Sequence, residues 1–274
     1  MKSLVYFLLL LLVVACNRKP DMTAEIERIK ELGNSHPDSA LSVYESIRGA
    51  VMKSSPARTR MKCELLGVRL RDKNDIIPSS DSIIRVLLDY YEDKGSNQEL
   101  QEVYYYAGSV YRDLQDIPRS LDYFLKSSER TEYGKVDSLL LRNCYSQLCL
   151  SYFNVQNYKE SLRAALEECR IAESIGVLDD LSLIHLSNNY LRLGEDSLAI
   201  NVMTRILEHQ ESIEPEKREW GILCDLLCSY SSLLKIDQAS ECYRLLEKTE
   251  KGLRGRCPWM TSPLTSQISS SYGT

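Results

Sequence analysis

Cysteine and histidine side chains are the residues of this sequence whose types and spacing could support metal binding or nucleophilic catalysis. Cys224 and Cys228 lie four residues apart, so on a helix their thiols would share one face, as two metal ligands would. His36, His185 and His209 lie in no metal-binding or nucleophile motif, and none is close in sequence to these two cysteines. The sequence also contains no phosphate-binding loop, nucleophile elbow or His-Glu-x-x-His motif. We therefore expect no metal, no cofactor and no enzymatic activity.

Cys16 follows a short apolar segment at the N-terminus and indicates a different chemistry. Residues 4–15 form an unbroken apolar run after Lys2, shorter than the ~20 residues that a membrane-spanning helix needs. The end of the run, Val13-Val14-Ala15-Cys16, resembles the lipobox of bacterial lipoproteins. The resemblance implies that residues 1–15 are a signal peptide and that acyl chains on Cys16 anchor the mature protein to a membrane. The alternative is an ordinary signal peptide, or a core helix, with an incidental cysteine.

Residues 16–22 would then form a lipidated tether. The tether lacks the acidic run that resembles a surface-export signal of Bacteroidetes-type lipoproteins, so we expect a periplasm-facing protein of the cell envelope, at the inner or outer membrane. Export permits disulfides, but the pairing of the eight other cysteines cannot be deduced from the sequence.

The stretch from residue 23 to residue 250 predicts one helix after another. Only twelve glycines and eight prolines occur in 274 residues, which favours long helices joined by short loops. Pro37, Pro118 and Pro215 each lie where a helix is expected to begin, the position at which a missing N–H costs little. The sequence therefore predicts an all-α fold.

Four segments of this stretch repeat one pattern of large and small residues at the same spacing. The recurring positions are Tyr104, Ala107, Gly108, Tyr111, Ser120, Phe124 and Ser127; Tyr145, Leu148, Cys149, Tyr152, Ser161, Ala165 and Glu168; Leu183, Leu186, Ser187, Tyr190, Ala199, Met203 and Ile206; and Leu223, Leu226, Leu227, Tyr230, Ala239, Tyr243 and Leu246.

This pattern resembles the tetratricopeptide repeat (TPR), which implies an α-α superhelical solenoid of antiparallel helix pairs. The repeat tyrosines are spaced 41, 38 and 40 residues apart, whereas a TPR has a period of about 34, so a generic α-solenoid of another repeat type stays possible. The resemblance assigns packing roles between neighbouring helices to Tyr104, Gly108, Tyr111, Phe124, Tyr152, Tyr190, Ala199, Tyr230 and Ala239.

A narrower resemblance is to TPR lipoproteins of Bacteroides-like bacteria. It rests on Asp72-Lys73-Asn74, on residues 79–83, on Asp89-Tyr90-Tyr91 and on residues 104–108. Longer relatives in that group continue into a transmembrane helix and a DNA-binding domain, so we expect this chain to be a sensor-like half without an output half.

In TPR proteins the first helix of each pair lines a concave groove, and the resemblance implies such a groove here. Its expected lining is Glu102, Tyr105, Ser109, Arg112, Asn143, Ser146, Leu150, Phe153, Ile184, Asn188 and Leu191. It lacks the recurring Lys and Asn with which some family members hold a peptide carboxylate. Its apolar members would alternatively pack against an adjacent helix.

These observations favour a membrane-anchored module that binds a protein or peptide, in a sensory or regulatory role. An envelope-assembly scaffold is the alternative, and a glycan-capture lipoprotein ranks below it. A nucleic-acid partner is not expected, because Asp and Glu (39) outnumber Lys and Arg (34) and no basic run occurs. The tail, residues 251–274, is expected to be disordered, a cap or a truncated repeat.

Overall fold

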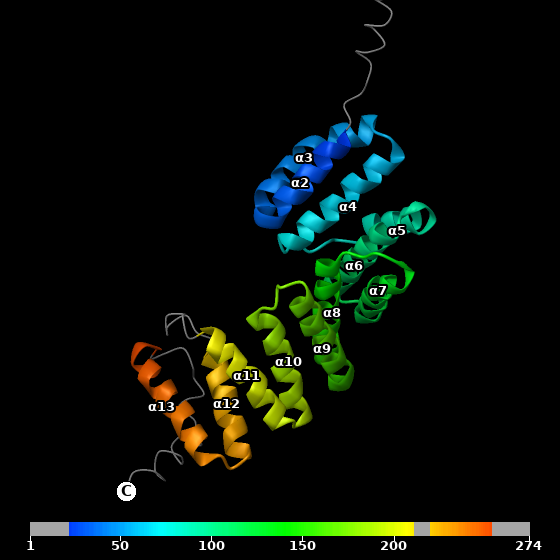
Figure 1. The fold of residues 1–274 in the computed structure, drawn as a ribbon. Coiled ribbons are helices and arrows are strands. Elements are labelled where there is room, and N and C mark those ends of the chain that lie inside the picture. The colour runs from blue at the N-terminus through cyan, green and yellow to red at the C-terminus, as the bar shows by residue number, and fades with distance from the viewer. Residues whose placement is uncertain (1–21, 211–219, 254–274) are drawn as a thin grey trace, which may run out of the picture. The chain divides into compact units, whose positions relative to one another are not determined.

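A computed structural model describes residues 22–210 and 220–253, and within these ranges the chain forms only helices (Figure 1). The prediction of an all-α fold is therefore confirmed. The α-helices are α2 (Met22–Ser35), α3 (Pro37–Ser54), α4 (Ala57–Lys73), α5 (Ser82–Lys94), α6 (Asn97–Asp113), α7 (Ile117–Glu129), α8 (Ser138–Asn154), α9 (Tyr158–Ser174), α10 (Asp180–Leu193), α11 (Asp196–Gln210), α12 (Trp220–Ser232) and α13 (Ile236–Leu253), and a 3-10 helix, η1, spans Arg130–Tyr133.

Three of the predicted segments lie largely outside the described residues. These are the signal peptide, the tether with Cys16 and the tail of residues 251–274, of which residues 251–253 are described as the end of α13. Among the helices of the described ranges, none has the length and apolarity that crossing a membrane requires.

The chain divides into two compact units, one ending at Leu148 and the other beginning at Cys149, so that α8 belongs partly to each. In the first unit, α2, α3 and α4 pack against one another and α6 packs against α4, α5 and α7. In the second unit, α10 packs against α9 and α11, and α12 against α11 and α13. The consecutive helices from α2 to α7 and from α9 to α13 are thus neighbours in space, as helical hairpins require.

Four helices end in the same turn, at the same distance from the repeat tyrosine. The residue four positions after that tyrosine has a left-handed backbone, with φ between 55° and 75°, in each case: Gln115, Gln156, Gly194 and Leu234. The next residue donates its N–H to the carbonyl of the tyrosine at 2.8–2.9 Å. This is the left-handed C-terminal cap of an α-helix. Its recurrence shows that the four predicted segments share one backbone design.

The cap also occurs at the end of α9, where Gly176 has a φ of 71° and the N–H of Val177 donates to the carbonyl of Ala172 at 2.9 Å, and at the end of α4. Asp75 has a φ of 54°, and the N–H of Ile76 donates to the carbonyl of Arg71 at 3.0 Å. Helix α4 therefore ends as α6, α8, α10 and α12 do. Helix α4 carries Arg71 where the four repeats have tyrosine, and the sequence around Gly67 and Leu70 indicates only a degenerate repeat.

Small residues allow the two helices of a pair to approach closely. A Cβ added to Gly108 of α6 would lie 2.6 Å from ring atoms of Phe124 in α7, which is fully buried. The hydroxyl of Ser120 donates to the Gly108 carbonyl at 2.9 Å, and Ser161 donates to the Cys149 carbonyl at the same distance one repeat later. The predicted roles of Gly108 and Phe124 correspond to this contact.

The other predicted packing residues differ in burial. Ala199 is fully buried, and Tyr111 is buried with its ring stacked on that of Tyr123 at 5.5 Å. Partial exposure is found for Tyr104, Tyr152, Tyr190, Tyr230 and Ala239.

Replacing Gly108 by alanine should destabilise the protein, because the buried ring of Phe124 leaves no space for the added methyl group. We expect a loss of about 1–3 kcal/mol in the free energy of unfolding, measured by urea denaturation. The matched control is Gly49→Ala in α3, where an added Cβ meets nothing within 4 Å. There alanine should stabilise the helix, by up to about 1 kcal/mol. Equal effects of the two substitutions would contradict close packing at Gly108.

Candidate functional site

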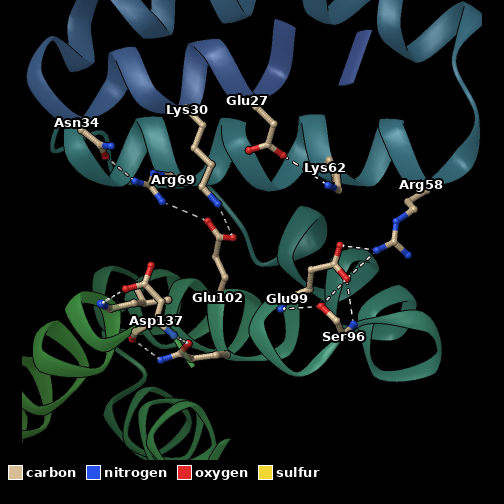
Figure 2. A network of polar contacts seen from close by, with 12 residues as sticks. Glu27, Lys30, Asn34, Arg58, Lys62, Arg69, Ser96, Glu99, Glu102 and Asp137 are labelled. Carbon is tan, nitrogen blue, oxygen red and sulfur yellow. Dashed lines mark hydrogen bonds and ion pairs between the residues drawn. The ribbon is translucent and has the colours of Figure 1, made fainter. Parts of the chain in front are cut away.

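A cleft of about 360 Å³ lies in the first unit, among helices α2, α4, α6 and the start of α8 (Figure 2). Its apolar lining residues are at most 9% exposed, so they form a floor: Ile26, Leu65, Leu66, Tyr91 and Leu140. Charged side chains make up most of the remaining wall: Glu27, Lys30, Arg58, Lys62, Arg69, Glu99, Glu102 and Asp137. The cleft therefore combines an apolar floor with a charged rim.

Helical spacing brings these charges to one place. Arg58, Lys62 and Arg69 follow one another on α4 at intervals of four and seven residues, which keeps them on one face of the helix. Glu99 and Glu102 are three residues apart on α6 and reach towards that face (Figure 2).

Ion pairs connect α6 to α2 and α4 across the cleft. The carboxylate of Glu102 accepts a hydrogen bond from Nζ of Lys30 at 2.7 Å and from Arg69 at 3.2 Å. Nη2 of Arg58 donates to both carboxylate oxygens of Glu99, at 2.8 and 2.9 Å. Each of these pairs joins residues 33–72 positions apart in the sequence. They fix how α6 lies against the preceding helices.

Glu99 also caps its own helix. Its carboxylate accepts from the backbone N–H and the hydroxyl of Ser96, and its backbone N–H donates to the Ser96 hydroxyl, which forms a capping box. Burial alone would raise the pKa of Glu99, but the Ser96 hydrogen bonds and the charges of Arg58 and Lys62 outweigh it and lower that pKa. Glu99 is therefore ionised at neutral pH and already supplied with donors.

Arg112 links α6 to α4 and α8 at a second place in the same unit. Its guanidinium donates to Asp72 at 3.1 Å, to Asp113 at 2.8 Å and to the side-chain oxygen of Gln147 at 2.8 Å. Burial raises the pKa of Asp72, although the positive charge of Arg112 opposes this shift. Arg112 therefore favours the charged form of a largely buried carboxyl group, against the effect of burial.

The comparisons with known proteins identify the fold. A putative kinesin light chain with nearly identical TPR-like repeats from Podosopora anserina superposes with a TM-score of 0.56 over 72% of this chain and 97% of its own, at 11% identity. The apo form of RapI superposes with a TM-score of 0.68 over 88% of this chain and 68% of its own, at 12% identity. BtubC from P. vanneervenii superposes with a TM-score of 0.59 over 85% of this chain and 94% of its own, at 13% identity.

The fold is TPR-like. A Rap protein complexed with competence and sporulation factor is a further neighbour, with a TM-score of 0.56 over 84% of this chain and 66% of its own, at 13% identity. No protein-family model and no curated protein matches the sequence. At these identities the likeness shows the fold alone. The predicted TPR-like repeats are thus confirmed, and the longer period is a variation on this fold.

Three residues of the predicted groove are buried instead of lining an open surface. These are Tyr105, Ser109 and Ser146, at 8%, 1% and 9% exposure. Helix α6 packs against α4, α5 and α7, so residues 105–111 are all buried, and the ring of Tyr105 contacts that of Phe124 at 5.7 Å. The prediction that these positions line an open groove is therefore wrong. Ser146 likewise lies on the buried arc of α8.

The other predicted groove residues retain exposed surface. In the first unit these are Glu102, Arg112 and Asn143; only Glu102 lines the cleft, and Arg112 belongs to the second link. In the second unit Leu150 is 40% exposed, and Phe153 lies against Tyr158 and beneath the guanidinium of Arg192. Partly exposed side chains are also found for Ile184, Asn188 and Leu191.

Most cysteines of the described residues are buried. Seven cysteines are present there, and six of them are buried while Cys228 is exposed. Burial raises the pKa of Cys144 and of Cys169 to about 12, so both thiols stay protonated at neutral pH. The ranges that the structure describes contain no cluster of His, Cys, Asp and Glu that could hold a metal ion.

Replacing Arg112 by alanine should destabilise the protein at neutral pH, because it leaves the Asp72 carboxylate without its main partner. We expect a loss of about 2 kcal/mol, measured by denaturant unfolding. Without Arg112 the pKa of Asp72 rises further, so the loss should shrink as the pH falls towards 4 and the carboxyl becomes protonated.

The control for this prediction is Arg163→Ala, which breaks an exposed pair with Glu160 in α9 and should change stability little. A loss from Arg112→Ala that is the same at pH 7 and pH 4 would contradict a role in holding the charge of Asp72.

Proposed function

We propose that this chain is a lipid-anchored interaction module of the bacterial cell envelope, which binds an extended segment of a protein in the cleft among α2, α4 and α6. The observation that carries the proposal is the cleft itself, a concave site with an apolar floor and a charged rim on a TPR-like scaffold. Apolar area supplies affinity in such sites, and polar groups at fixed positions supply specificity. The volume of the cleft suits a few side chains of a peptide.

The neighbouring structures support binding as the mode of action. One of them, a Rap protein, is complexed with competence and sporulation factor. In a stack of helix pairs, the second helix of each pair covers only one side of the first helix. The other side stays uncovered, and extended partners bind such surfaces in repeat proteins. The protonated buried thiols and the absence of catalytic sequence motifs favour a binding function without catalysis.

The proposed location rests on the sequence around Cys16. The apolar run of residues 4–15 and the residues before the cysteine fit a lipoprotein signal. A module anchored in this way would meet its partner at the membrane, where a sensory or regulatory role is the one we favour.

Cross-linking in cells tests the cleft. A photo-cross-linking residue at Gln98, an exposed residue of the cleft wall, should capture a partner that the same residue at Lys159 on α9 does not capture. The full chain, purified in detergent, should then bind the purified partner in calorimetry. Gln98→Trp should weaken this binding about tenfold or more by filling the mouth of the cleft, and Lys159→Trp should not. Equal affinities of the two variants would refute the cleft as the binding site.

Substitution of Cys16 tests the anchor. In cells fed a palmitate analogue, the wild-type chain should carry the label and sediment with membranes, because its thiol bears an acyl chain. Cys16→Ser should lose the label and leave the membrane fraction, or accumulate with its signal peptide uncut. The matched control, Cys228→Ser, changes an exposed thiol elsewhere in the chain and should keep the label. A Cys16→Ser variant that is still labelled would refute the anchor.

A further inference from the structure

We propose that the cleft among α2, α4 and α6 selects an acidic segment of its protein partner, through the cations of α2 and α4. This inference rests on the proposed function, because it names the chemistry of the partner that the cleft binds. Four cations and four carboxylates line the cleft, so their numbers alone favour neither an acidic nor a basic partner. The preference comes from which of these groups still have free hydrogen-bonding capacity.

Three of the four carboxylates are already occupied. Glu99 accepts from Arg58 and from two groups of Ser96, and Glu102 accepts from two cations. One carboxylate oxygen of Asp137 accepts from the backbone N–H groups of Leu139 and Leu140 and so caps the start of α8. Glu99 and Glu102 are also only 16% exposed. Basic groups of a partner would therefore find Glu27, which is 51% exposed, and the second carboxylate oxygen of the exposed residue Asp137.

The cations, in contrast, retain free donors. Arg58 uses only Nη2 for Glu99, and its side chain is 54% exposed. Lys62 has three N–H donors and one contact, at 3.4 Å to Glu27, and Lys30 uses one of its three donors on Glu102. Within the described part of the chain, Nε of Arg69 is buried without a hydrogen-bond partner. Arginine and lysine donors of this kind bind carboxylates through charge-assisted hydrogen bonds.

The apolar floor makes a protein segment a better occupant than an isolated anion or a lipid headgroup. Ile26, Leu66 and Tyr91 line the same cleft as the cations and offer contact to apolar side chains, which a headgroup does not have. The two partly buried carboxylates beside Arg58 and Arg69 would also repel a dianionic phosphate more strongly than the single charge of an Asp or Glu side chain. A segment in which acidic and apolar residues alternate matches both the rim and the floor.

Three amidated, fluorescein-labelled peptides test the inference: one alternates Glu with Leu, one Gln with Leu and one Lys with Leu. Each is titrated against the full chain in detergent by fluorescence anisotropy. We expect the Glu peptide to bind about tenfold or more tightly than the other two, with an affinity that falls as salt is added. Arg58→Gln with Lys62→Gln should weaken its binding about tenfold and make binding less dependent on salt.

A matched control has the same charges at the same spacing. Lys159→Gln with Arg163→Gln removes one lysine and one arginine four residues apart on α9, outside the cleft, and should leave binding of the Glu peptide unchanged. Circular dichroism and thermal unfolding of both double variants report whether they are folded. If both double variants weaken binding of the Glu peptide equally, the inference is overturned, because the effect would then depend only on the net charge of the protein.

The remaining outcomes separate this inference from the proposed function. Equal binding of the Glu and Gln peptides, both blocked by Gln98→Trp, would overturn the acidic preference and leave a peptide-binding cleft. Binding of phosphatidylglycerol vesicles that requires Arg58 and Lys62, without binding of the Glu peptide, would assign these cations to a lipid surface and overturn the inference. If no peptide binds, the inference fails, and the cross-link from Gln98 decides the proposed function independently.

Discussion

Close approach of the two helices of each pair is the constraint on which the rest of this structure depends. A helix hairpin buries its apolar faces only if some positions of the contact carry small residues, and Gly108 opposite Phe124 shows how little room is left. The left-handed cap after each repeat tyrosine sets where the second helix begins. Burial of apolar area provides the free energy of folding. The small residues and the left-handed caps determine how the helices lie against one another when that area is buried.

The cleft follows from this constraint. Because α6 is buried against α4, α5 and α7, few of its residues remain available to a partner, and Glu102 near its start is one of them. The charged side chains of α2 and α4 complete the wall. Ion pairs such as Lys30–Glu102 are partly buried, with side chains 32% and 16% exposed, so they hold neighbouring helices in register more than they stabilise the fold.

The sequence predicted the helices and the repeat register because both are local properties. Apolar periodicity and small residues at fixed offsets identify helix pairs without knowledge of the partner helices, and the recurring caps follow the same register. The cleft could not be predicted in the same way. Its ion pairs join Lys30 to Glu102 and Arg58 to Glu99, 72 and 41 residues apart, and no local pattern records such contacts.

The wrong assignments have the same physical origin. Tyr105 and Ser109 lie beside true core positions of α6, and a helix with three neighbours buries a wider arc than a helix with two. A local signal for the cleft did exist in Arg58, Lys62 and Arg69, which occupy one face of a helix. The four-repeat pattern does not extend to this helix, because Arg71 stands where the other repeats have tyrosine.

One repeat position shows how polar groups specify which helices meet. The last position of the pattern is buried in all four repeats and holds Ser127, Glu168, Ile206 and Leu246. Apolar side chains there would tolerate many apolar neighbours. Glu168, which is fully buried, instead contacts the hydroxyl of Ser182 and Nδ1 of His185, each at 3.0 Å. Any other register of α10 against α9 would bury this carboxyl without those partners, and an unsatisfied buried carboxyl costs more than a poor apolar contact. The contact between α9 and α10 is therefore specified largely by the free-energy cost of leaving the Glu168 carboxyl without partners. The contact between α6 and α7 is specified by the fit of Phe124 against Gly108.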